Sequence, residues 1–346
     1  SAASYVYKIQ KSFRDRLLRH PFSAVASIFA LVFFFSACSS GADAEIINPP
    51  LDSDKFSFIV AGHTYGAHFG KNIGLYPKFH DSMLKQDEYD FLVLTGDFIR
   101  NKMKENYDAV LADLDELSKP YYLVMGNHDN SDIGRMIFNE KYGATYYSFS
   151  IRQNLFVFLD SQIRPYAISD EQLRFLEEQL KNRTYSNVFI YFHELLWLNY
   201  GKYNDLTANY NAPKYYKTNF WQELFPLFLQ HADIRFYVTA GDVGGNPHSI
   251  PAFYDRIGNV TLVASGMGEV EDENYLKIEV DREKVKMTVL PLWDKKPARP
   301  VEWYNVDNMR NRFTHCVYPK CALPRPSHKP GLWDRILKYL GCKCAG

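Results

Sequence analysis

Five short apolar runs alternate with helical patterns through the middle of this chain. The runs are Phe56–Ala61, Phe91–Thr95, Tyr121–Met125, Asn187–Phe192 and Ile234–Ala240. Runs of this length that end at turn-like or polar residues predict buried strands. Helical patterns fill the gaps near residues 75–86, 103–118, 169–183 and 218–231. This alternation predicts an α/β sandwich whose sheets are buried by helices.

The last part of the same region has a different pattern. Three further strand-like runs, Asn259–Ala264, Tyr275–Asp281 and Lys284–Leu290, follow one another without a helix between them, and Asp281–Lys284 has the composition of a turn. Strands joined by short turns pair antiparallel. We therefore expect mixed sheets rather than purely parallel ones.

Side chains that can bind a metal or transfer a proton follow all five of the first runs. The segments are Gly62-His63-Thr64-Tyr65-Gly66, Gly96-Asp97-Phe98-Ile99-Arg100-Asn101, Gly126-Asn127-His128-Asp129, His193-Glu194 and Gly241-Asp242-Val243-Gly244. A single Gly-Asp pair is often only a turn, and a single His is often a core residue. Because ligand sites of α/β sheets lie at the carboxyl ends of strands, five such segments in succession predict one functional site.

The order of these segments resembles the calcineurin-like metallophosphoesterase family, which includes the purple acid phosphatases, over roughly residues 55–292. The most specific matches are Gly96-Asp97 and, thirty residues later, Gly126-Asn127-His128-Asp129. The resemblance implies a four-layer αββα sandwich of two mixed sheets that presents two metal ions bridged by Asp97. It also implies that Asn127 and His193 hold the second metal, and that His128 is the acid that protonates the leaving oxygen.

The first and last motifs depart from the family pattern. The usual Gly-Asp-x-His-Gly aligns with residues 62–66, so His63 replaces the Asp and Tyr65 replaces the His; a register shifted by two would keep His63 as the His. The usual Gly-His-x-His becomes residues 241–244, which places Asp242 at the first His. By this mapping the second metal keeps four ligands, Asp97, Asn127, His193 and Asp242. The first metal keeps Asp97 and His63, so one metal, an altered pair and an empty site all stay open.

The chemistry of the residues that match the family motifs suits phosphate-ester hydrolysis. Carboxylate, carboxamide and imidazole ligands together suit Mn, Zn or Fe, as one or two divalent or trivalent ions per site. His128, with Asp129 in the same motif, is the expected general acid. Arg100 could pair with a phosphate oxygen, although a surface salt bridge is an equal alternative.

Residues 196–221 form a long segment rich in aromatic side chains just after His193. Long loops beside a site commonly act as lids or binding surfaces. Trp197 and Tyr200, together with Tyr65, are therefore the candidate substrate-binding residues. The alternative is a loop that folds on its own aromatic cluster.

The N-terminal region predicts attachment to a membrane. Residues 1–20 carry five Lys and Arg against one Asp, and residues 21–38 carry no charge. An uncharged segment of this length after a basic flank predicts a transmembrane helix or signal anchor that exports the following chain to the periplasm or extracellular space. A cleaved signal that ends at Cys38 is the second possibility and a buried core helix the third. Residues 39–54 have the composition of a linker.

The C-terminal region, residues 293–346, is a basic tail with eleven Lys and Arg against four Asp and Glu. It contains Cys316, Cys321, Cys342 and Cys344, an even number that suggests two disulfides in an exported protein, with a four-thiolate zinc site as the rival. The whole chain has 40 basic and 40 acidic residues, so its charge gives no reason to expect a nucleic-acid partner.

Together these features predict a membrane-anchored, extracytoplasmic, metal-dependent phosphoesterase. Its substrate would be a small-molecule, lipid or glycan phosphate ester of the envelope. The alternative is a catalytically degenerate relative that serves as a binding or scaffold subunit of an envelope protein complex.

Overall fold

The computed structural model describes residues 49, 51, 53–66, 70–181, 184–209, 216–245, 249–268, 272–293 and 296–314 of the 346-residue chain. The predicted anchor, most of the predicted linker and all five cysteines lie outside the described residues. In the part that is described, no helix is both long enough and apolar enough to span a membrane.

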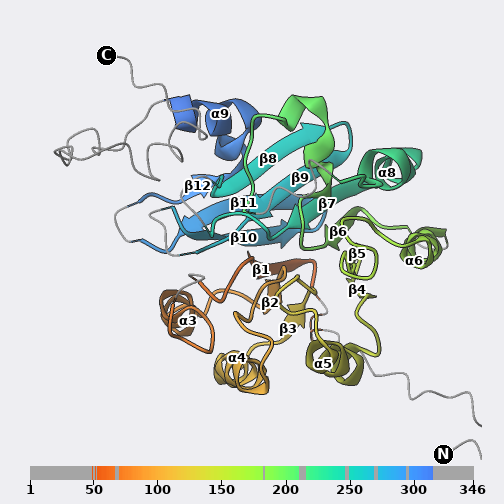
Figure 1. Cartoon of the computed structure of the whole chain (residues 1–346). Helices are drawn as coiled ribbons and strands as arrows, with labels where there is room; N and C mark the ends of the chain where they lie inside the picture. The colour runs from red at the N-terminus through yellow and green to blue at the C-terminus, as the bar shows by residue number, and fades with distance from the viewer. Residues whose placement is uncertain are drawn as a thin grey trace, which may run out of the picture.

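Two six-stranded mixed sheets form the centre of the molecule (Figure 1). The first sheet has the order β12 (Arg299–Pro300), β11 (Lys284–Pro291), β10 (Asn274–Asp281), β1 (Lys55–Ala61), β2 (Phe91–Leu94), β3 (Tyr121–Leu123). The second has the order β4 (Tyr147–Ile151), β5 (Asn154–Phe158), β6 (Asn187–Tyr191), β7 (Arg235–Ala240), β9 (Val260–Ser265), β8 (Ala252–Ile257). β1, β2 and β3 run parallel, as do β5, β6, β7 and β9, whereas all the other neighbouring strands pair antiparallel. The predicted mixed α/β class is confirmed.

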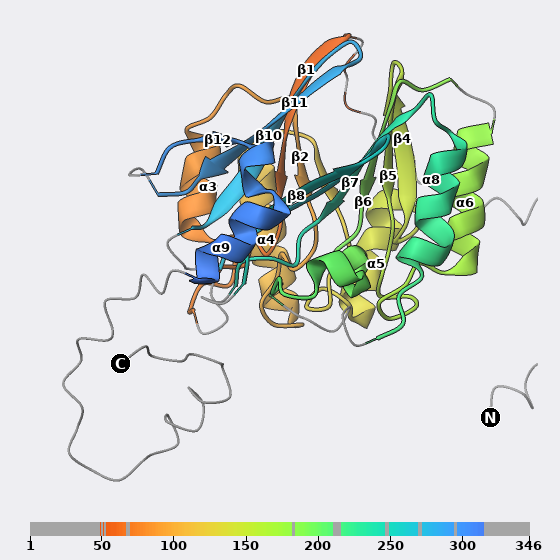
Figure 2. The same cartoon turned by 90° about the horizontal axis from the view of Figure 1, so that it is seen from above.

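Helices lie outside the two sheets. α3 (Pro77–Leu84), α4 (Lys104–Glu116) and α5 (Asp132–Tyr142) belong to the first half of the chain, and α6 (Asp170–Lys181) and α8 (Phe225–Gln230) to the second. Figure 2 shows α6 and α8 on the side of the second sheet that faces away from the first. The arrangement is consistent with the sandwich that the alternation of strands and helices predicts.

Phenylalanine rings fill the space between the sheets. Phe58 of β1 and Phe91 of β2 stack at 4.7 Å, and both meet Phe156 of β5 edge to face, with ring centroids 5.4 and 5.5 Å apart. All three side chains are fully buried. Each buried ring contributes roughly 1.5–3 kcal/mol, so this aromatic layer fixes how the two sheets sit against each other.

Several elements escaped the sequence-based prediction. β4 alternates buried and half-buried residues instead of forming an apolar run, and Arg152, with φ 52°, turns the chain into β5. α5 has its signals at its ends: the Ser131 side chain accepts a hydrogen bond from the Gly134 amide, and Gly143 ends the helix in the left-handed conformation. The sequence between these two capping residues mixes polar and apolar side chains, so the helix was not predicted.

The beginning of the predicted tail packs on the body. β12 pairs with β11, and Val301, which follows β12, is buried in the hydrophobic core. Met309 of α9 (Val306–Thr314) is buried as well. The folded unit therefore continues beyond residue 293, where the tail was expected to begin.

Candidate active site at the strand ends

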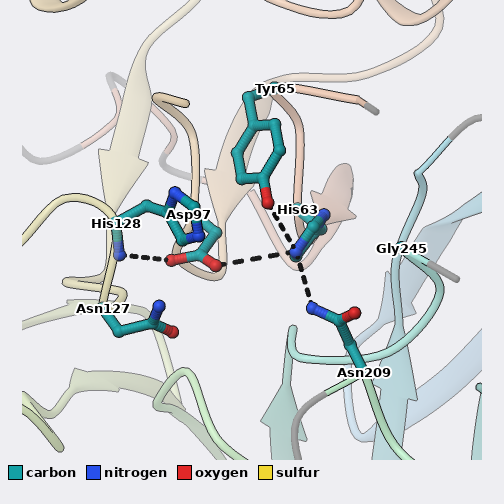
Figure 3. A pocket seen from close by; sticks show the side chains of 7 residues that line it. All are labelled: His63, Tyr65, Asp97, Asn127, His128, Asn209 and Gly245. Carbon is teal, nitrogen blue, oxygen red and sulfur yellow. Dashed lines mark hydrogen bonds and ion pairs between the residues drawn. The ribbon is translucent and has the colours of Figure 1, made fainter. Parts of the chain in front are cut away.

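A pocket of about 240 Å³ lies where the carboxyl ends of β1, β2, β3 and β7 meet (Figure 3). Its lining residues are His63, Tyr65, Asp97, Asn127, His128, Asn209 and Gly245. The sequence-based prediction named the first five, and the structure brings them together at one end of the sandwich.

Asp97 is the centre of this group. Its Oδ1 accepts a hydrogen bond from the His128 amide at 2.9 Å and lies 3.4 Å from His193 Nε2, and its Oδ2 lies 3.6 Å from His63 Nε2. Burial alone would raise the pKa of this carboxyl, but the neighbouring imidazoles, His193 first, outweigh burial and hold its pKa well below the ordinary value. Asp97 also has φ 54°, a left-handed conformation that costs about 1–3 kcal/mol in a residue other than glycine.

Asp129 stabilises the loops around Asp97 from behind the pocket. Its carboxylate accepts hydrogen bonds from the amides of Asp97 (2.6 Å), Phe98 (3.0 Å), Ile99 (3.1 Å) and Gly126 (2.9 Å). The side chain is fully buried and is not among the lining residues. Its prediction as a catalytic residue is therefore corrected to a positioning role, because every one of these contacts goes to backbone.

His128 lies in the pocket with its ring orientation fixed. Its Nδ1 lies 2.8 Å from the Arg100 carbonyl oxygen, and because a carbonyl only accepts, Nδ1 carries the hydrogen. The ring centroid is 4.8 Å from that of Tyr65. This geometry leaves Nε2 as the nitrogen that can exchange a proton with a molecule in the pocket.

Arg100 does not line the pocket. Its guanidinium donates hydrogen bonds to the carbonyl oxygens of Gly70 and Asn72 and to Asn72 Oδ1, and it is 8% exposed. The predicted contact with a phosphate oxygen is therefore wrong for this arrangement, because these bonds direct the guanidinium to the loop that follows Tyr65.

His193 and Asp242, two of the predicted ligands, are buried behind the lining residues. His193 Nδ1 donates to the Thr95 carbonyl at 2.9 Å across the sheets. This approach needs glycine at position 96, because a Cβ there would lie only 2.4 Å from the same nitrogen. Burial lowers the pKa of His193, but the Asp97 carboxylate outweighs burial and raises it. Burial raises the pKa of Asp242 to about 7. Both residues contact the lining, His193 through Asp97 and Asp242 through Asn209.

On this side of Asp97, two buried atoms are of the kinds that bind metal ions. Among the described residues, His193 Nε2 and Asp242 Oδ2 are buried without a hydrogen-bond partner. The 3.4 Å between Asp97 Oδ1 and His193 Nε2 is long for a hydrogen bond but matches the separation of about 3.4 Å between neighbouring ligands of a tetrahedral ion bound at about 2.1 Å. Nevertheless, no group of three or more His, Cys, Asp and Glu side chains is already gathered as a metal site among the described residues.

On the other side of Asp97, the side chains do not fit a metal ion. His63 Nε2 lies 2.8 Å from Asn209 Nδ2 and 3.2 Å from the Tyr65 hydroxyl. Burial lowers the pKa of His63 to about 4, so the ring is neutral near pH 7. Burial also raises the pKa of Tyr65, so its hydroxyl keeps its proton. These contacts engage His63 Nε2, while His63 Nδ1 has no hydrogen-bond partner among the described residues. Because Nε2 is engaged, the ordinary two-metal centre is not matched here.

Two of the predicted substrate-binding residues lie outside the pocket. Trp197 is fully buried and packs on Phe192, Phe220 and Phe253, with ring centroids 5.8–5.9 Å apart. Tyr200 is 49% exposed and packs on Trp221 at 4.8 Å. The described part of residues 196–221 thus folds on its own aromatic cluster, as the alternative interpretation held, because large rings are stabilised by burial.

Two lining residues, Asn209 and Gly245, were not predicted. Asn209 lies in the aromatic segment, 146 residues from His63, and no motif marks it. Gly245 follows the altered last motif and has φ 71°. The run Gly244-Gly245 was the available signal, because two adjacent glycines often mark a close approach of backbone to other groups.

The sequence profile of the family described as calcineurin-like phosphoesterase matches residues 69–266, more than half of the chain. A protein of Fibrobacter succinogenes named a probable cyclic nucleotide phosphodiesterase is 29% identical over 96 residues, which are 27% of this chain and 37% of that protein. Two solved structures are also similar. They are a predicted phosphoesterase of Streptococcus pneumoniae (TM-score 0.34, 11% identity, 71% of this chain and 98% of that one) and vacuolar protein sorting 29 of Cryptosporidium parvum (TM-score 0.38, 13% identity, 71% and 96%).

Proposed function

This chain belongs to the calcineurin-like phosphoesterase family, and from that premise we propose that it hydrolyses a phosphate ester with His128 as the proton donor. One observation carries the proposal: the amide of His128 binds the Asp97 carboxylate while its imidazole is held in the pocket by the Arg100 carbonyl. A proton donor is thereby fixed beside the Asp97 carboxylate.

Different residues of the chain would bind the metal ion, transfer the proton and position the loops. Asp97, Asn127, His193 and Asp242 would hold a metal ion, which would supply Lewis-acid stabilisation of charge on the phosphoryl oxygens. Asn127 is exposed to the pocket and can reach an entering ligand. His128 would transfer a proton to the leaving oxygen, which accelerates such steps by about 10²–10⁴-fold. Asp129 holds the loops on which Asp97 and His128 lie.

A phosphodiester is the preferred substrate class. The Fibrobacter protein is named for phosphodiesters, although the match covers little more than a third of it, so this preference is carried over only as a proposal. When water attacks the phosphorus of a phosphodiester, the bond to one ester oxygen breaks and that oxygen leaves as an alkoxide, whose protonation is the role proposed for His128. Lipid and glycan phosphate esters of an envelope are further candidate substrates within this proposal.

The proposed location is a membrane, with the body exposed to the periplasm or the extracellular space. The support is the basic flank in residues 1–20 and the uncharged residues 21–38 that follow it. Both stretches lie outside the described residues, so the proposal rests on sequence alone.

A second candidate function is a binding or scaffold subunit without turnover. The observation that favours it is the side of the pocket where Tyr65 and Asn209 both lie within hydrogen-bond distance of His63 Nε2, so that this nitrogen is engaged instead of open to a metal ion. In that case the pocket would bind a phosphate ester without cleaving it.

One assay separates the two candidates. The purified full chain is tested against a generic phosphodiester, a generic phosphomonoester and a cyclic nucleotide, with Mn, Zn or Fe added, beside a His128→Ala variant. Hydrolysis that depends on His128 and is fastest on a diester supports the proposal. Turnover no greater than that of His128→Ala, with an ester still bound, would support the scaffold function instead.

A further inference from the structure

We propose that Asn209 limits the site to a single cation, because its amide occupies the His63 nitrogen that would otherwise join Asp97 in holding a second one. The inference rests on the proposed function only in placing a cation beside Asp97. It concerns a residue that no sequence motif marks and that reaches the pocket from the aromatic segment.

The position of Asn209 is fixed from three directions. Its backbone amide donates to the Asp242 carbonyl at 3.1 Å, and its Nδ2 donates to Asp242 Oδ1 at 3.1 Å. On the opposite side, a Cβ on Gly245 would lie 2.5 Å from Asn209 Oδ1 and 3.1 Å from the His63 ring, so only glycine leaves room for this pair. The glycine therefore lets the asparagine reach the histidine.

The contact with Asp242 determines which end of the Asn209 amide meets His63. The NH₂ group of Asn209 points toward Asp242 Oδ1, to which it donates at 3.1 Å. The same NH₂ group lies 2.8 Å from His63 Nε2 and therefore donates to it as well. The Nε2 lone pair is engaged, although this nitrogen is only 3.6 Å from Asp97 Oδ2, a separation suited to two ligands of one ion.

On the opposite side of Asp97, the described part of the chain supplies no donor to the corresponding atoms. There His193 Nε2 has no hydrogen-bond partner, and Asn209 binds Asp242 through Oδ1 while Oδ2 stays unpartnered. Buried polar atoms of this kind are normally satisfied, and a cation is a ligand that both would accept. One amide thus closes one position and orients a ligand of the other.

The number of bound ions tests the inference. The full chain, stripped with a chelator and dialysed against excess Mn²⁺, is analysed for manganese per chain, and the electron paramagnetic resonance spectrum distinguishes isolated from coupled Mn²⁺. We expect one isolated ion in the unsubstituted chain. Asn209→Ala frees His63 Nε2 and should bind a second ion at least about tenfold more tightly than the unsubstituted chain does.

Further variants make the result specific. Asn209→Ala combined with His63→Ala should return to one ion, because the freed nitrogen is then absent. Asn204→Ala, an exposed asparagine of the same segment, is the matched control and should hold one ion. If Asn209→Ala does not fold, Asn209→Leu keeps the volume, donates no hydrogen bond and gives the same readout.

The outcomes separate this inference from the proposed function. Two ions in the unsubstituted chain, none at all, or one ion in both folded Asn209 variants would overturn the inference, whatever the activity. Two ions together with ester hydrolysis would leave the proposed function standing. One ion without turnover above that of His128→Ala would keep the inference and overturn the function.

Discussion

The polar side chains on the two sides of Asp97 differ in how their nitrogen and oxygen atoms are paired. On one side, His63, Tyr65 and Asn209 pair among themselves. On the other, His193 and Asp242 keep one polar atom each without a partner in a buried setting. Leaving such an atom unpaired costs about 1–3 kcal/mol. Among the described residues His63 Nδ1 is unpartnered as well, so the two sides differ in which metal-binding atoms stay open: His193 Nε2 and Asp242 Oδ2 on one side are open, whereas His63 Nε2 on the other is engaged by Asn209.

The largest expected effect falls on the residue that both sides share. Asp97→Asn removes the negative charge that faces both histidines while keeping the shape of the side chain. We expect ester hydrolysis to fall by about a thousandfold or more, because charge stabilisation at the reacting group is the largest catalytic contribution. Steady-state rates and metal analysis of the same sample measure the change. Full activity in a folded Asp97→Asn chain would remove Asp97 from the site.

A paired substitution tests the two sides directly. His193→Ala removes a proposed ligand, so we expect metal affinity to fall by at least about a hundredfold, whereas His63→Ala should change it by no more than a fewfold. Equilibrium dialysis with Mn²⁺ gives both values, and thermal unfolding of the two variants controls for a general loss of structure. Equal losses in the two variants would mean that the sides do not differ.

The proton donor should affect rate without affecting metal. His128→Ala is expected to lower the rate about a hundredfold, because general acid catalysis contributes about 10²–10⁴-fold, while the bound metal stays unchanged. An ester with a leaving group that needs no protonation serves as the control, since its hydrolysis should be much less affected. A loss of metal in this variant would place His128 among the ligands instead.

The smallest expected effect belongs to Tyr65. Tyr65→Phe removes the hydroxyl 3.2 Å from His63 Nε2 but leaves the closer Asn209 contact in place. We expect a change of less than about tenfold in rate and no change in metal content, because a neutral hydrogen bond contributes about 0.5–1.5 kcal/mol. Rate measurements beside metal analysis decide it. A second bound ion in this variant would assign the closing role to Tyr65 rather than to Asn209.

Local patterns in the sequence predicted much of the fold. The apolar runs that became β1, β2, β6 and β7 carry their signal within a few residues, and so does the hairpin of β10 and β11, where Asp281 pairs with Lys284. β4 and α5 were missed because their burial depends on contacts distant in sequence, such as the hydrogen bonds from Tyr147 of β4 to the Leu123 carbonyl at 2.8 Å and from Tyr142 of α5 to the Tyr121 carbonyl at 3.1 Å. A local pattern does not record such contacts.

The candidate site divides in the same way. Asp97, Asn127 and His128 follow strand ends, and they were predicted from that position together with the family resemblance of their motifs. Arg100 and Trp197 were misassigned because their residue types suit a binding role, whereas their contacts, backbone carbonyls for one and aromatic rings for the other, exist only in the folded chain. Asn209 could not be found at all, since its role depends on Gly245 and His63 from other parts of the sequence.

The hydrogen bond from His193 to the Thr95 carbonyl ties the end of one sheet to the end of the other. Asp97 belongs to the first sheet and His193 to the second, so the distance between them measures how the sheets are seated on their layer of phenylalanine rings. A shift of about 1 Å in reacting groups can cost about a hundredfold in rate. The aromatic layer between the sheets therefore sets the distances between the pocket residues of the two sheets. A cavity made around Phe156 would change these distances although Phe156 itself does not line the pocket.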